Sequence, residues 1–141
     1  MHILLDTDVV LDLFLDREPF AEAAAIIWQA HEQASLTAYI SAITPINLFY
    51  IARKLKGRDI ARQAINELLA TLPVCTIDHA ILQVGAASDF KDFEDAVQYA
   101  SAVAGGMEAI VTRNIKDYQS ASLPVYTPED FLRQFPLANE G

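Results

Sequence analysis

Cysteine is nearly absent from this sequence, and long apolar runs are absent as well. The single cysteine, Cys75, excludes an internal disulfide and a zinc site built from several cysteines. The longest uncharged stretch runs from Gln33 up to Arg53, and its Ser, Thr, Pro and Asn residues are unlike those of a membrane span. No basic or long apolar segment precedes Asp6, so a signal peptide is not expected. We therefore expect a cytoplasmic protein that does not contact a membrane.

Basic residues are also scarce. Ten Lys and Arg stand against nineteen Asp and Glu, which gives a formal net charge of −9. This balance argues against a protein that binds nucleic acid through an overall excess of positive charge. It does not exclude an enzyme that acts on nucleic acid, because carboxylates gathered around divalent cations contribute to the same excess. The 141 residues, 52% of them hydrophobic, predict one folded domain spanning residues 1–141.

Short apolar segments alternate with segments of helical periodicity along the chain. Strands are predicted at residues 3–5, 36–40, 74–77, 109–111 and 124–126. Helices are predicted at residues 9–15, 20–34, 41–55, 59–72, 79–87 and 92–104, and from residue 127 onward. This order predicts an α/β fold, a three-layer α/β/α sandwich around a mainly parallel sheet of about five strands. Ligands of such sheets bind beyond the carboxyl ends of the strands.

Acidic side chains gather at this predicted ligand-binding edge. Asp6 and Asp8 follow the first strand, and Asp117 follows the fourth. Asp92 and Asp95 share one face of a helix, where two like charges are unfavourable unless a cation or a basic group lies between them. Oxygen ligands of this kind suit Mg²⁺ or Mn²⁺, which activates water and stabilises charge on a transferring phosphoryl group.

Neutral and basic side chains at the same strand ends complete the candidate site. Thr and Asn side chains at a strand exit form hydrogen bonds with backbone groups or carboxylates, and Asn114 is also a candidate for the catalytic set. The residues expected to bind substrate or to support the acids are Ser41, Thr44, Asn47, Thr112, Arg113 and Lys116.

Taken in order, these motifs resemble the PIN domain family, the fold of many VapC-type toxin ribonucleases. The resembling segments are residues 4–9, 40–44, 93–96, 111–114 and 125–129, so the resemblance spans nearly the whole chain. It implies a metal-dependent endoribonuclease with a cluster of about four acids. Asp6 matches the first acid, Asp8 the polar residue after it, and Asp95 the acid that opens the long helix. Asn114 lies where an acid or Asn follows the Thr, with Asp117 close behind.

One position departs from the pattern of this family. The helix after the second strand usually begins with a Ser or Thr stretch that leads to a Glu, and Asn47 takes that place here. An amide can ligate through its oxygen but carries no charge, so the site keeps fewer carboxylates than the common pattern. Asp92, Glu94 or Asp117 are the acids that would compensate. The chain thus resembles a PIN subgroup rather than the commonest type.

The resemblance also implies partners. These are an RNA substrate, a cognate antitoxin protein of a type II toxin–antitoxin pair, and a second copy of the chain in a homodimer. Basic residues expected to contact RNA phosphates are Arg53, Lys54, Arg113 and Lys116.

Two other functions stay open at this point. An apolar strand followed by Asp-x-Asp also resembles the nucleophile motif of haloacid-dehalogenase-type phosphatases, with Asp6 as nucleophile and Asp8 as general acid. That mechanism needs a late lysine, and Lys116 is the only candidate. Asn47 motivates the other alternative, a catalytically silent PIN-like interaction module.

Overall fold

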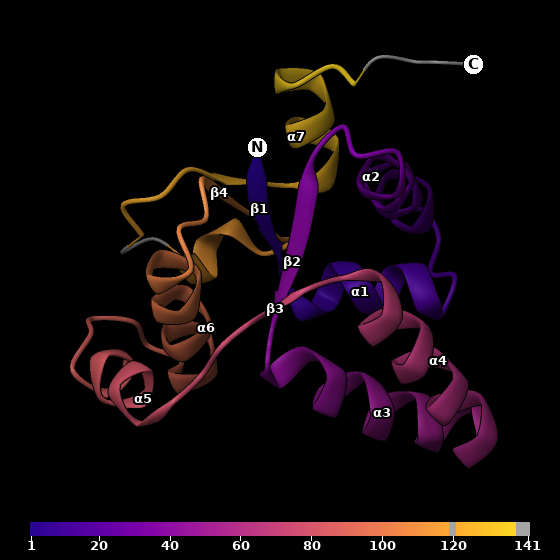
Figure 1. Ribbon diagram of the computed structural model, residues 1–141, viewed down its shortest axis with the longest axis horizontal. Coiled ribbons are helices and arrows are strands. Elements are labelled where there is room, and N and C mark those ends of the chain that lie inside the picture. Colours follow the sequence, from indigo (N-terminus) through magenta and orange to yellow (C-terminus); the bar gives the residue numbers. More distant parts are fainter. Residues whose placement is uncertain (119–120, 138–141) are drawn as a thin grey trace.

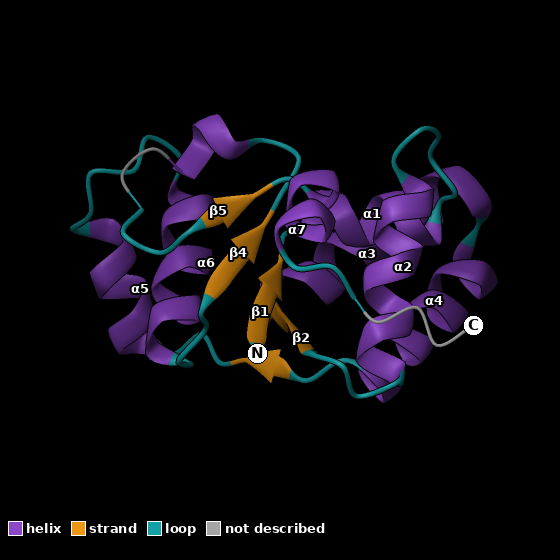
Figure 2. Cartoon of the chain, turned by 90° about the horizontal axis from the view of Figure 1, so that it is seen from above, coloured by secondary structure: helices purple, strands orange, loops and turns teal. Residues whose placement is uncertain are grey.

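A five-stranded parallel sheet forms the centre of the computed structural model, which describes residues 1–118 and 121–137. Its spatial order is β3-β2-β1-β4-β5. The strands are β1 (His2–Leu5), β2 (Thr37–Ser41), β3 (Val74–Cys75), β4 (Ala109–Val111) and β5 (Val125–Tyr126). Figure 1 shows the elements along the chain, and Figure 2 shows the sheet between two layers of helices. The predicted three-layer α/β/α sandwich is therefore confirmed.

Seven α-helices and one short 3₁₀ helix surround the sheet in the described ranges. They are α1 (Thr7–Phe14), α2 (Ala21–Glu32), α3 (Ile43–Lys56), α4 (Arg58–Thr71), α5 (His79–Ala86), α6 (Phe93–Ala104), η1 (Ile115–Tyr118) and α7 (Pro128–Gln134). The predicted elements match these within two residues at each bound, because the capping signals are local. Thr127, for example, caps α7 by accepting from the backbone N–H of Asp130. The sequence pattern did not predict η1.

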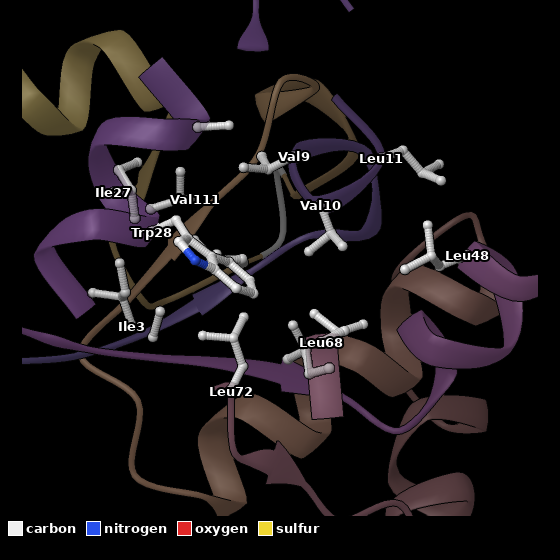
Figure 3. Close-up of a cluster of buried hydrophobic side chains, with 14 of the residues drawn as sticks. Ile3, Val9, Val10, Leu11, Ile27, Trp28, Leu48, Leu68, Leu72 and Val111 are labelled. Carbon is white, nitrogen blue, oxygen red and sulfur yellow. The ribbon is translucent and has the colours of Figure 1, made fainter. Parts of the chain in front are cut away.

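The sheet is buried on both faces, which explains why its strands are continuous apolar runs rather than alternating ones. Ile3, Leu5 and Val111 point into the larger cluster beneath α1, α2, α3, α4 and α7, part of which is drawn in Figure 3. Leu4 and Ile110 point into a smaller cluster that includes Ala102 of α6 and Tyr118 of η1. None of the helices in the described ranges is long and apolar enough to span a bilayer.

Pairing between strands determines which residues leave the sheet side by side. Leu5 of β1 lies opposite Val111 of β4, so Asp6 and Thr112 emerge next to each other. The backbone N–H of Asp6 donates to the carbonyl of Val111 at 2.9 Å. Ser41 ends β2 on the other side of β1, so side chains from three strands meet at one edge.

Candidate active site

Asp6 is held in one orientation at this edge by four donors. It caps α1 by accepting from the backbone N–H of Thr7 at 2.7 Å. The Gln98 amide donates to the same carboxylate at 2.7 Å, the Thr112 hydroxyl at 2.7 Å and the Tyr118 hydroxyl at 3.3 Å. Only 9% of Asp6 is exposed. Hydrogen bonds of this kind satisfy a buried carboxylate and fix the direction in which its remaining lone pairs point.

Gln98 connects this carboxylate to the neighbouring strand. It lies on α6, buried, and its Oε1 accepts from the Ser41 hydroxyl at 2.7 Å while its Nε2 also lies 2.9 Å from the Tyr118 hydroxyl. Sequence reasoning included Ser41 and Thr112 but missed Gln98 and Tyr118. A glutamine among the apolar residues of the buried face of α6 was the available signal, since a buried amide requires partners.

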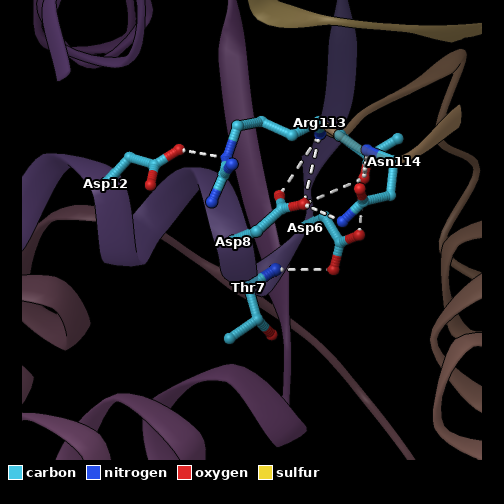
Figure 4. A network of polar contacts seen from close by, with 7 residues as sticks. Asp6, Thr7, Asp8, Asp12, Arg113 and Asn114 are labelled. Carbon is cyan, nitrogen blue, oxygen red and sulfur yellow. Dashed lines mark hydrogen bonds and ion pairs between the residues drawn. The ribbon is translucent and has the colours of Figure 1, made fainter. Parts of the chain in front are cut away.

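Asp8, on α1, forms hydrogen bonds with the loop after β4. Its carboxylate accepts from the backbone N–H of Arg113 at 3.2 Å and from the side-chain amide of Asn114 at 3.1 Å (Figure 4). Burial, and then the charge of Asp6, raise the pKa of Asp8 to about 7. The structure thus brings Asp6, Asp8, Thr112 and Asn114 together, with the amide of Asn114 turned toward Asp8.

Asp12 is a buried acid that sequence reasoning did not identify. Its side chain is 1% exposed, and its Oδ2 lies 2.7 Å from Nε of Arg113, close enough for an ion pair but not aligned as a hydrogen bond. The Arg113 guanidinium also stacks 4.1 Å from the centre of the Phe20 ring. Burial raises the pKa of Asp12, and the positive charge of Arg113 opposes that rise. Arg113 is therefore already paired with an acid, although its side chain is 28% exposed, and its contact with RNA phosphates stays a prediction.

Asp95 lies at the start of α6, facing the other acids. Burial is the largest cause that raises its pKa to about 7, followed by the charges of Asp6, Asp92, Asp117 and Glu94. Asp92 precedes α6 as its N-cap, and its carboxylate accepts from the backbone N–H of Asp95 at 2.9 Å. The acids that were predicted after two strands and on one helix face thus influence one another.

A cleft of about 340 Å³ opens over this group of acids. Asp92, Asp95 and Asp117 line it together with two cations, Lys91 and Lys116. Asp117 is exposed in η1, and sequence reasoning included Lys116 but not Lys91. In such a cleft the carboxylates can attract a metal ion, and the lysines can attract a phosphate group.

Asn47 reaches the same edge from α3. Its side-chain amide donates to the Glu94 carboxylate at 2.6 Å, which joins α3 to the first turn of α6. Thr44, buried on α3, forms a hydroxyl–hydroxyl contact of 2.9 Å with Thr7 of α1. Position 47 therefore carries an amide in place of the carboxylate that is usual in the family. The Glu94 carboxylate lies next to that amide.

Comparison with known proteins identifies the fold family. The family model described as "PIN domain" matches residues 2–116. The chain belongs to the PIN domain family. No curated protein matches the sequence of this PIN domain.

Solved structures resemble this PIN domain over most of its length. A toxin-antitoxin complex from Klebsiella pneumoniae is 29% identical with a TM-score of 0.67, covering 89% of this chain and 97% of the other. FitAcB from Neisseria gonorrhoeae is 21% identical with a TM-score of 0.67, covering 90% and 98%. VapC20 from Mycobacterium tuberculosis, described as a Sarcin-Ricin loop cleaving toxin, is 14% identical with a TM-score of 0.61, covering 77% and 86%. At these lower identities the likeness shows the fold.

The acids of this PIN domain fit a hard divalent cation in their chemistry. Asp8 and Asp95 are half-buried carboxyl groups with acidic neighbours, so added positive charge would favour their ionised forms. In residues 1–118 and 121–137, no three His, Cys, Asp or Glu side chains form a group that could hold a metal.

Proposed function

We propose that this PIN domain is a Mg²⁺- or Mn²⁺-dependent endoribonuclease and the toxin of a type II toxin–antitoxin pair. The observation that carries the proposal is the position of Asp95, which lines a cleft with Asp92 and Asp117 and whose pKa is raised by burial and by the charge of the nearby Asp6. Membership of the PIN domain family, a family of nucleases, and structural likeness to a toxin-antitoxin complex support the same reaction class.

The ion would be held by Asp6 and Asp95, with Asp8, Asp92, Asp117 and Glu94 as the nearby acids. When bound, it would supply positive charge that activates water and stabilises the phosphorane-like transition state.

The chain's own residues prepare this site. Gln98 and Thr112 orient the Asp6 carboxylate, and Asp8 holds the backbone of the loop that carries Asn114. Lys91 and Lys116 line the cleft, where each can bind a phosphate oxygen of RNA. Together these groups would place the phosphodiester next to the acids. The lysines would offset the repulsion between the RNA phosphate and the carboxylates.

The test is cleavage of single-stranded and structured RNA by the purified chain with Mn²⁺, with Mg²⁺ or with EDTA. We expect metal-dependent cleavage that Asp95→Asn abolishes and that Glu67→Gln, which removes an exposed charge from α4, leaves unchanged. Cleavage that persists in EDTA or in Asp95→Asn would refute the proposed site.

A calorimetric titration with Mn²⁺ separates this proposal from a silent PIN-like module. Absence of binding at millimolar metal favours the silent module. The phosphatase alternative has lost its basis, because the matched family is the PIN domain and the Asp8 carboxylate is engaged by the loop after β4. Cytoplasmic location stays a prediction.

The proposed partners are a cognate antitoxin and a second copy of the chain. The structural relative from Klebsiella pneumoniae is described as a toxin-antitoxin complex, which supports the first of these. Coexpression with the product of the adjacent gene should yield a stable complex that suppresses RNA cleavage. Sedimentation of the isolated chain should give the mass of a dimer.

A further inference from the structure

The positive charge of this acidic protein is concentrated at one place outside the acidic cleft. Five of its ten Lys and Arg residues lie within residues 53–62, which contain a single acid, Asp59. We call this group the basic tip. It consists of Arg53, Lys54, Lys56, Arg58 and Arg62, all exposed.

The turn between α3 and α4 brings these cations together. Gly57 joins the two helices with a φ of +91°, a conformation that residues with a side chain rarely adopt. Helices α3 and α4 pack against each other as a hairpin, and Figure 1 shows the hairpin extending away from α5 and α6. The tip is therefore a projecting surface that carries cations from both helices.

Helix stability alone does not explain where these cations lie. Cations in the last turn of α3 interact favourably with the helix dipole. Arg58, however, is the first residue of α4, where the dipole disfavours a positive charge. In the described ranges the two ion pairs join Arg113 to Asp12 and Arg133 to Asp130, so no carboxylate neutralises the tip. An external anion is the partner that this arrangement suits.

One face of α3 connects the basic tip to the acidic cleft. Asn47, Tyr50 and Lys54 follow one another at helical spacing, and Asn47 already contacts Glu94 beside the cleft. The Tyr50 side chain is 60% exposed, and the edge-to-face contact with Phe49, at 5.2 Å between ring centres, supports its ring. At 1.5 Å per residue, Lys54 lies about 10 Å and Lys56 about 14 Å along the helix from Asn47.

From these observations we propose that the exposed face of α3 and the basic tip bind a single-stranded segment of the RNA substrate. A base stacks on Tyr50 and backbone phosphates contact the cations of the tip, at a distance from the bond that is cut. The inference rests on the proposed ribonuclease function and adds the kind of RNA required. At about 3.4 Å per stacked nucleotide, the distance of about 14 Å from Asn47 to Lys56 corresponds to roughly four nucleotides, so the strand must continue at least that far beyond the cleft to reach Lys56.

Binding is tested without cleavage, in EDTA, by fluorescence anisotropy of a labelled 20-nucleotide single-stranded RNA at several salt concentrations. The triple variant Lys54→Gln, Arg58→Gln, Arg62→Gln should lower the slope of log affinity against log salt by about 2, because each phosphate contact in a single strand contributes about 0.7. The control Arg133→Gln, on α7, should leave the slope unchanged. An unchanged slope in the triple variant overturns the proposal.

Two variants of Tyr50 test whether an RNA base stacks on its ring. Tyr50→Ala should weaken binding about 10-fold, whereas Tyr50→Phe should retain wild-type affinity. Polyglutamate of the same charge serves as an acidic polypeptide probe. If it binds as tightly as RNA and Tyr50→Ala does not weaken the RNA complex, the tip is a surface for an acidic protein and the RNA assignment fails.

Cleavage assays with Mn²⁺ separate this inference from the proposed function. Wild type should cut both the 20-nucleotide RNA and a trinucleotide, and the triple variant should lose activity only on the longer RNA. Equal loss on both RNAs overturns the inference, since a trinucleotide is too short to reach the tip. If wild type cuts neither RNA, the proposed nuclease function fails, while the anisotropy slopes still decide whether the tip binds RNA.

Discussion

Replacing Asp95 by Asn should stabilise the protein when no metal is present. In the folded protein the pKa of Asp95 is raised from 3.8 to about 7, chiefly by burial and then by the charge of Asp6. The ionised carboxylate is therefore disfavoured in the folded state at pH 8. At about 1.4 kcal/mol per pKa unit the destabilisation has an upper bound of about 4 kcal/mol, and solvent screening of this half-buried group reduces it to about 2 kcal/mol.

The dependence on pH has a definite sign. Because the folded-state pKa lies above the unfolded value, wild type is most stable when Asp95 is protonated in both states. Stability falls as the pH rises from 3.8 and reaches its lower level above about 7. The advantage of Asp95→Asn should therefore be largest at pH 8, smaller at pH 5, and absent below pH 3.8.

Thermal unfolding in EDTA measures this effect. For a chain of 141 residues, about 2 kcal/mol corresponds to a rise in Tm of roughly 7 °C at pH 8. Glu67→Gln removes the same charge from an exposed position on α4 and should change Tm little. A Tm for Asp95→Asn at or below that of wild type at pH 8, or an equal gain at pH 5 and pH 8, would refute the reasoning.

Three further outcomes are expected. Gln98→Leu should destabilise the protein by about 1–3 kcal/mol in urea unfolding, because the buried Ser41 hydroxyl and the Asp6 carboxylate each lose a partner. Arg113→Gln should cost about 3–5 kcal/mol, since Asp12 then remains buried without its cation, and the double variant with Asp12→Asn should recover most of that loss. Saturating Mn²⁺ at 100 times its Kd should stabilise wild type at pH 8 by about 2.7 kcal/mol, and EDTA should reverse the shift in Tm.

The fold could be predicted because its signals are local. The β1 segment Ile3–Leu5 is apolar without interruption because both faces of the sheet are covered, and Asp78 and Thr127 each begin a helix by accepting a backbone N–H. The strand ends also located Asp6 and Thr112 correctly at one edge, since a parallel sheet brings its carboxyl ends together.

Partners that depend on three-dimensional packing could not be predicted in the same way. The engagement of Arg113 by Asp12 and Phe20 depends on how α1 and the segment before α2 approach the loop after β4. An acid inside the apolar stretch of α1 signals that some partner exists, but not which of ten cations it is. The Asn47–Glu94 contact likewise depends on the approach of α3 to α6.

Three acids of this edge, the buried Asp6 and Asp12 and the half-buried Asp95, differ in how their charge is compensated within the fold. Asp12 faces a guanidinium, and Asp6 accepts four hydrogen bonds. In the described part of the chain the Asp95 carboxylate has neither an ion-pair partner nor a hydrogen-bond donor, and its neighbours are acids. Ion pairs and hydrogen bonds satisfy the first two groups within the fold, so of these three acids Asp95 gains most from an external cation. The carboxylate that lacks a positively charged partner therefore lines the cleft. The net charge of −9 alone would not show where on the protein a cation binds.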